Sequence, residues 1–230
     1  MKIEVNSEDF IKKNKMIFDM NEHLRLDGQI NQARNLIIDG PISEKYFGSQ
    51  PKILWVLKEA HSDKGGGSLI KHLNNDFIER DIPGYPKWHT TWGLIVKVSH
   101  AILFNNFIMS DYSYRDIKTS LRHIAAINLN KFGGGETESD HYHEGSQKCK
   151  NIVQDQYKLL DPDIVIFGGT SHYLSHLINR DIDIQNFYPR KSEFPYIKDG
   201  KKTFIAAYHT NQKELRHTKY CEYICAAISM

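Results

Sequence analysis

The sequence predicts an α/β domain, a three-layer α/β/α sandwich with a central, mostly parallel four-stranded sheet. Four short apolar segments alternate with amphipathic helical segments along the chain, the pattern of parallel strands joined by right-handed crossovers. The apolar segments are continuous, as expected for strands buried on both faces. The 230 residues contain no linker rich in Pro, Ser or Gly, so we expect one domain over residues 1–230.

The apolar segments place the strands. Turn residues at Gly48 to Pro51 precede the first segment, ILWVL, and Asp161-Pro162 precede the third, IVIF. A hairpin over residues 196–207 leads into the last strand. The four strands are therefore expected at residues 53–57, 124–129, 164–167 and 203–207.

Helices are expected between these strands. Residues 92–107 and 149–160 carry apolar side chains at helical spacing. Another helix should follow Gly168-Gly169, capped by Thr170 or Ser171. The polar, glycine-rich residues 133–145 predict a long surface loop.

The first fifty residues are expected to form a helical N-terminal extension. Residues 8–23 have acidic side chains in the first turn and apolar ones at helical spacing. A second helix, weakened by Gly28, should run to Ile38.

Composition limits the partners. Lys and Arg number 30 against 28 Asp and Glu, so any contact with a polyanion must be a local patch. The three cysteines form no CxxC pair and no disulfide framework, which favours a reducing compartment, and we expect a cytoplasmic monomer. No segment approaches the roughly 20 apolar residues of a membrane span, so no membrane partner is expected.

The candidate site lies where the predicted parallel strands end, because ligands of open parallel sheets bind beyond the carboxyl ends of the strands. Glu59, Asn128 and His209 follow three different strands. An Asn side chain matches the N–H and C=O edge of a planar ring, and a His can stabilise a developing oxyanion. The three side chains together predict a site for a nucleobase-like ligand.

The ordered segments ILWVLKEA, AINLNK, LLDPDIVIFGG and FIAAYHTNQKELR resemble the uracil-DNA glycosylase superfamily, most closely its iron–sulfur branch. They are similar to that branch's G-E-A-P-G, T-N-x-x-K, L-x-P strand and H-P-S motifs, in that order. The resemblance covers roughly residues 51–216 and is sparse between residues 69 and 124.

The resemblance implies base excision from DNA, the hydrolysis of the N-glycosidic bond of an extruded uracil or related damaged base. Glu59 would orient the attacking water and His209 would hydrogen-bond the departing base. Asn128 would read the base edge, with Ala60 and His61 lining the base site. Contacts to DNA would come from Gly168, Thr210, Asn211, Leu215 and Arg216, with Leu215 as an apolar wedge and Arg216 on a phosphate.

No cofactor is expected. Among the branch's cluster cysteines only Cys149 has a counterpart, and one thiolate does not hold an iron–sulfur centre. Hydrolysis of this kind requires no metal. The aromatic side chain that stacks on the base is not identified by a motif, and Tyr85, Trp88 and Trp92 are candidates on chemistry alone.

Other interpretations remain open. The chain could be an inactive relative that binds nucleic acid or a nucleotide, or a hydrolase of free nucleosides. Residues 65–67 could cradle a phosphate but favour a flexible loop. Asp140, His141, His143 and Glu144 could hold a metal but favour a solvated loop, and the basic residues 190–191 and 198–202 favour a solvated surface over a phosphate patch.

Overall fold

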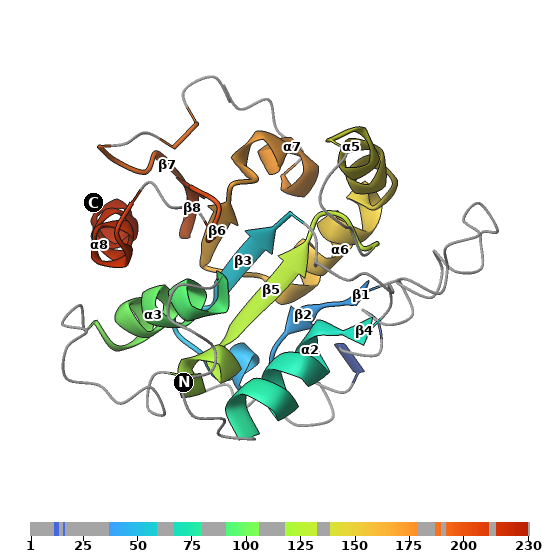
Figure 1. The fold of residues 1–230 in the computed structure, drawn as a ribbon, viewed down its shortest axis with the longest axis horizontal. Helices are drawn as coiled ribbons and strands as arrows, with labels where there is room; N and C mark the ends of the chain where they lie inside the picture. Colours follow the sequence, from blue (N-terminus) through green and yellow to red (C-terminus); the bar gives the residue numbers. More distant parts are fainter. Residues whose placement is uncertain are drawn as a thin grey trace.

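The computed structural model describes residues 12–13, 16, 37–58, 67–79, 91–105, 118–132, 139–178, 187–189, 192–211 and 215–229. Four parallel strands form the centre of its main sheet, in the order β5, β3, β6, β8 (Figure 1). Their bounds are Ile124–Asn128, Ile53–Leu57, Ile164–Gly168 and Lys202–Ala207. The four predicted strands are thus confirmed, and so is a mixed α/β fold with a mostly parallel sheet.

Two antiparallel edge strands extend this sheet to six strands within the described residues. On one edge β2 (Gly40–Pro41) pairs with β5. On the other edge β7 (Tyr196–Asp199) pairs with β8, which confirms the predicted hairpin. Strand β2 was not predicted from the sequence, because a two-residue strand has no periodicity to detect.

The predicted helix up to Ile38 is wrong at its end. Residues Ile37–Ile38 form strand β1, which pairs in parallel with β4 (Gly67–Ser68). The backbone N–H of Ile37 donates to the carbonyl of Lys131 at 2.8 Å, so tertiary pairing overrides the helical spacing. Lys12, Lys13 and Met16 are helical, as predicted for residues 8–23, and the rest of the N-terminal extension lies outside the described residues.

Both faces of the sheet carry apolar side chains, because alternate residues of β3 point to opposite faces. Trp55 packs with α3 (Thr91–Phe104) and α8 (His217–Ser229). Leu54 and Val56 pack with α6 (Lys150–Leu160) and α7 (Leu174–Leu177). In Figure 1, α3 and α8 lie to one side of β3, and α6 lies to the other.

Shorter helical segments complete the described part of the chain. At the amino end of the sheet, η2 (Glu44–Gly48) packs against η4 (Thr119–His123), which leads into β5. The helix α2 (Leu69–Lys71) continues into the π-helix η3 (His72–Glu79), which also contacts η4. None of the helices in the described ranges is long and apolar enough to cross a membrane.

The predicted loop over residues 133–145 is wrong from Ser139 onward, where α5 (Ser139–Lys148) begins. Gly145 explains the error. A side chain there would place its Cβ 2.6 Å from Oδ1 of Asn130, so this glycine permits close packing of a helix and does not indicate flexibility.

Candidate functional site

The strand order locates the candidate site. From β3 the chain crosses to β5 on one side, and from β6 it crosses to β8 on the other. The two adjacent strands β3 and β6 therefore send their connections in opposite directions. Ligands of open α/β sheets bind beyond the carboxyl ends of strands at such a switch point. Lys58 follows β3 and Gly169 follows β6 at this position.

Hydrogen bonds tie the strand ends together. The carbonyl of Lys58 accepts from the backbone N–H of Asn130 at 3.1 Å, and the N–H of Gly169 donates to the carbonyl of Ala207 at 2.9 Å. The hydroxyl of Thr170 donates to the carbonyl of Val56 at 2.8 Å. Segments that follow β3, β5, β6 and β8 are thus held in one fixed arrangement.

Gly169 brings the chain after β6 against His209. Its φ of 76° lies in the left-handed region, and an added Cβ would lie 3.0 Å from the Cβ of His209 and 3.1 Å from its backbone nitrogen. Only glycine fits both the conformation and the space. This contact fixes the position of His209 relative to β6.

The protonation of His209 follows from its hydrogen bond. Its Nδ1 accepts from the backbone N–H of Asn211 at 3.1 Å, which places the ring proton of the neutral form on Nε2. Partial burial of the ring and the charge of Lys58 lower the pKa of His209 below its ordinary value. At neutral pH the exposed ring therefore offers an uncharged Nε2–H donor.

Asn128 lies at the end of β5 in a buried polar network around Asp39. The Asp39 carboxylate accepts from the backbone N–H of Asn128 at 2.7 Å and from its Nδ2 at 3.2 Å. It also accepts from Lys131 at 2.7 Å and from Gln156 at 3.0 Å. Sequence reasoning missed Asp39, because neither its position before Gly40 nor any spacing links it to Asn128.

The structure therefore does not bring Asn128 and His209 into contact. Strands β5 and β8 are separated by β3 and β6, which puts the two strand ends about 14 Å apart at the usual strand spacing. A ligand that touches both must span β3 and β6. Glu59, Ala60 and His61 lie outside the described residues.

The chain matches no protein-family model and no curated protein. Function must therefore be inferred from its own residues and their geometry.

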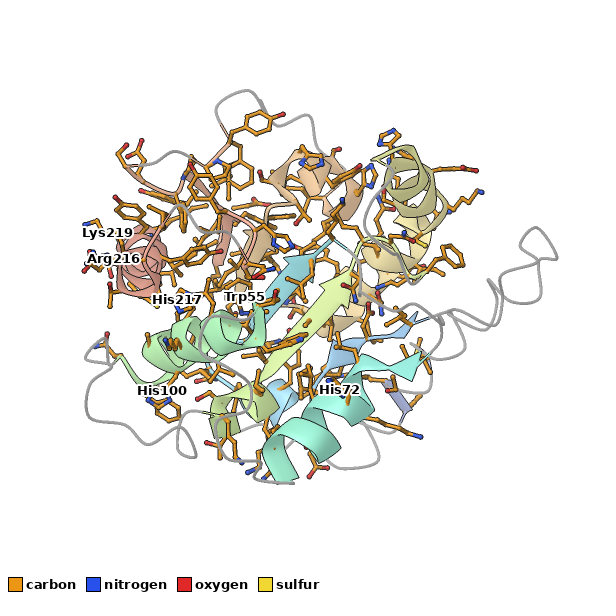
Figure 2. The ribbon with its side chains drawn as sticks, in the orientation of Figure 1. Trp55, His72, His100, Arg216, His217 and Lys219 are labelled. Atoms are coloured by element: carbon orange, nitrogen blue, oxygen red, sulfur yellow. The ribbon has the colours of Figure 1, made fainter. Side chains whose placement is uncertain are left out.

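The predicted DNA contacts differ in accessibility. Asn211 and Arg216 are exposed, whereas Leu215 is partly buried against the apolar cluster of α3 and α8. Thr210 is buried at 1% exposure, so its side chain is not available to a ligand in this conformation. Figure 2 shows Arg216 beside Lys219 at the start of α8.

The remaining predicted residues also have defined places. Gly168 ends β6, where an added Cβ would lie 3.3 Å from the side chain of Leu57. Trp92 packs against the cluster of α3 and α8, which leaves it less suited to stack on a base. The other two stacking candidates, Tyr85 and Trp88, lie outside the described residues.

Three histidines near the site are additional to those predicted there. His143 on α5 and the Tyr173 hydroxyl are hydrogen-bonded at 3.0 Å. The rings of His172 and His176 lie 4.2 and 4.8 Å from the Tyr173 ring, centroid to centroid. From the sequence, His143 was expected to be either a metal ligand or a solvated side chain on a loop.

Within the described ranges, no group of three or more His, Cys, Asp and Glu side chains could hold a metal ion. Cys149, Cys221 and Cys225 are buried free thiols. Burial raises the pKa of each of them, to about 12 for Cys221 and Cys225, so these thiols are poor nucleophiles.

Proposed function

We propose that this protein is a DNA glycosylase that hydrolyses the N-glycosidic bond of uracil or a related damaged base. The observation that carries the proposal is the neutral Nε2–H donor of His209 at the carboxyl edge of the sheet. Uracil that leaves its sugar departs as an anion, with negative charge shared by a carbonyl oxygen of the base. A fixed neutral donor stabilises that charge in the transition state.

The lowered pKa of His209 matters for this role. A neutral imidazole keeps its proton while it hydrogen-bonds the departing base, so the protonation state suits neutral pH. The nearby charge of Lys58, which lowers that pKa, also favours an anionic leaving group. Glu59 follows Lys58 directly in the sequence, and we assign it the attacking water and the cationic sugar.

Asn128 has the chemistry to read the base edge. Its Nδ2 donates to Asp39, and this bond fixes which end of the amide is the acceptor. Within the described part of the chain, Oδ1 of Asn128 makes no hydrogen bond, and it is left for a ring N–H. Asp39 is then a positioning residue for Asn128.

The DNA strand would lie over the loop after β8. Asn211 and Arg216 are exposed there and can contact phosphates. Leu215 would act as the wedge after leaving its partly buried position. The proposal includes a single three-layer domain, since helices pack on both faces of the sheet, and a cytoplasmic monomer as expected from composition.

The test is a single-turnover assay on duplexes that contain uracil, hypoxanthine or a mismatch. We expect abasic product from the wild type and a 10²- to 10³-fold lower rate from His209→Ala, the usual cost of one oxyanion donor. His72→Ala is the matched control, because His72 is an exposed histidine on η3 (Figure 2). Absence of product from the wild type, or equal rates for His209→Ala and wild type, would overturn the proposal.

A second candidate is a protein that binds nucleic acid or a nucleotide through the same edge without catalysis. The buried position of Asn128, at 1% exposure and bonded to Asp39, favours it because base reading requires access to this side chain. Salt-sensitive binding of uracil-containing DNA with no abasic product would identify the binder.

A further inference from the structure

The Asp39 carboxylate accepts two hydrogen bonds on each of its oxygens. Its Oδ2 accepts from the backbone N–H of Asn128 at 2.7 Å and from Nδ2 of the same residue at 3.2 Å. Its Oδ1 accepts from Nζ of Lys131 at 2.7 Å and from Nε2 of Gln156 at 3.0 Å. Four donors thus surround one carboxylate, which is the environment of an ionised group that only accepts.

The ion pair with Lys131 determines how Asp39 can bond to Asn128. The side chains of Asp39 and Lys131 are both fully buried. A buried carboxylate without a counter-charge would bind a proton, because burial disfavours the charged form. A protonated carboxyl can donate as well as accept, and either end of the Asn128 amide could then bond to it. The ammonium of Lys131 therefore restricts the amide to one orientation.

The opposite orientation of the Asn128 amide is repulsive beside this carboxylate. A rotation by 180° would exchange Oδ1 and Nδ2, and would put Oδ1 where Nδ2 now lies, 3.2 Å from Oδ2 of Asp39. Two acceptors would then face each other with no proton between them, and Nδ2 would lose its acceptor. The carboxylate is also held by the backbone N–H of Asn128. It therefore cannot turn away to relieve the repulsion.

The acceptor end of Asn128 is the end that a ligand can reach. The residue as a whole is only 1% exposed. Its Oδ1 makes no hydrogen bond within the described ranges, and it is not among the fully enclosed side-chain atoms that lack a partner, whereas Oε1 of Gln156 is. The small exposed area of Asn128 therefore includes Oδ1. Reading a ring N–H requires access to this one atom.

We propose that Asp39 and Lys131 form a specificity pair, which makes Asn128 a hydrogen-bond acceptor only. The matching ligand is a heterocycle with a ring N–H beside a carbonyl group, as in uracil. A ring with an unprotonated nitrogen at that position, as in cytosine, would face Oδ1 with a second acceptor. Both members of the pair are positioning residues that act through Asn128. The inference rests on the proposed function in one respect, that Asn128 contacts the base.

The first measurement compares the affinities of 1-methyluracil and 1-methylcytosine by NMR titration of the full-length protein. In both compounds the methyl group stands where the sugar is attached in a nucleotide. We expect 1-methyluracil to bind at least about tenfold more tightly, because two facing acceptors leave both groups unpaired. In 1,3-dimethyluracil the ring N–H is blocked, so it should bind as weakly as 1-methylcytosine. Equal affinities of the three compounds, or no binding of 1-methyluracil, would overturn the inference.

The second measurement repeats the comparison on the double variant Asp39→Ala/Lys131→Met. This variant removes the specificity pair without leaving a buried charge unpaired. The Asn128 amide can then rotate and offer Nδ2 to 1-methylcytosine, so the ratio of the two affinities should fall to about threefold or less. A ratio measured on one preparation does not depend on the folded fraction, and destabilisation alone does not change it. A double variant that keeps the wild-type ratio would overturn the specificity pair.

Ser99→Ala is the matched control. The hydroxyl of Ser99 is fully buried and accepts from Nε1 of Trp55 at 3.1 Å. Trp55 packs with α3 and α8, on the face of the sheet opposite to Gln156 and α6. Loss of this buried hydrogen bond should lower stability and leave the ratio of affinities at the wild-type value.

Hydrogen exchange tests the orientation of Asn128 without any substitution. Side-chain amide protons held on the Asp39 carboxylate should exchange with solvent at least about tenfold more slowly than those of Asn211, which is exposed. In the opposite orientation Nδ2 would occupy the accessible end. Exchange at Asn128 as fast as at Asn211 would therefore contradict the inference.

The results separate this inference from the proposed function, because none of the three measurements depends on catalysis. A preference for 1-methyluracil that the double variant loses, with no abasic product from DNA, supports the specificity pair and removes the glycosylase. Abasic product from the wild type, with equal ratios in the wild type and the double variant, removes the specificity pair alone.

Discussion

Removal of the Asp39 carboxylate tests the buried network that holds Asn128. Asp39 and Lys131 have fully buried side chains and their charged atoms lie 2.7 Å apart. Asp39→Ala leaves the Lys131 ammonium without its counter-charge and also deprives Asn128 and Gln156 of their acceptor. Breaking a buried pair from one side costs about 3–5 kcal/mol of unfolding free energy.

Urea unfolding followed by circular dichroism measures this cost. With an m-value of about 2–3 kcal/mol/M for a chain of this size, the urea midpoint should fall by about 1–2.5 M. Asp161→Asn is the control, since Asp161 is 67% exposed in its pairs with Lys52 and Lys202, and such exposed pairs contribute at most about 1 kcal/mol.

A second substitution separates charge from packing. Lys131→Met added to Asp39→Ala removes the unpaired ammonium, so the double variant should be more stable than Asp39→Ala alone. Equal midpoints for Asp39→Ala and Asp161→Asn would refute the reasoning, as would a double variant less stable than the single one.

Three further predictions concern the site and its surroundings. Gly169→Ala should lower the rate of abasic product formation at least tenfold, because its Cβ would displace His209. Gly200→Ala is the control, since Gly200 also has a positive φ but no atom lies within 4 Å of an added Cβ, and it should lose only stability. Equal activities of the two variants would contradict this prediction. The pKa of His176 is about 4 in the folded protein against 6.5 ordinarily, so between these pH values His176 binds a proton only when the chain unfolds. The free energy of unfolding should therefore fall by on the order of 2 kcal/mol as the pH drops from 6.5 to 4. Urea titrations of His176→Leu should show a smaller fall, and a fall equal to that of the wild type would contradict this role of His176. Arg216→Ala should weaken binding to duplex DNA by the same factor for all sequences and reduce the slope of log K against log salt concentration by about one. A loss of affinity that depends on the DNA sequence would argue against a phosphate contact.

The parallel strands were predictable because a strand that is buried on both faces requires apolar residues at consecutive positions in the sequence. Ile53, Leu54 and Trp55 are all fully buried, although they alternate between two apolar clusters. A continuous apolar run flanked by turns is the signature of such a strand. Because the carboxyl ends of parallel strands lie at one edge, this signature also located His209 near the end of β6.

The polar contacts were not predictable, because they join residues far apart in the chain. The Asp39–Lys131 pair spans 92 positions and depends on β2 lying beside β5. The bond from His143 to Tyr173 depends on α5, which forms within a segment whose glycines suggest a loop. Periodicity reports which face of an element is buried, but not which distant element covers it.

The central claim is that the carboxyl edge around His209 holds a flat heterocyclic base. Soaking crystals of the protein with uracil tests it most directly. We predict electron density for the ring with one of its oxygens within hydrogen-bond distance of His209 Nε2. Uracil bound at another surface, or no density beside His209 at saturating uracil, would contradict the claim.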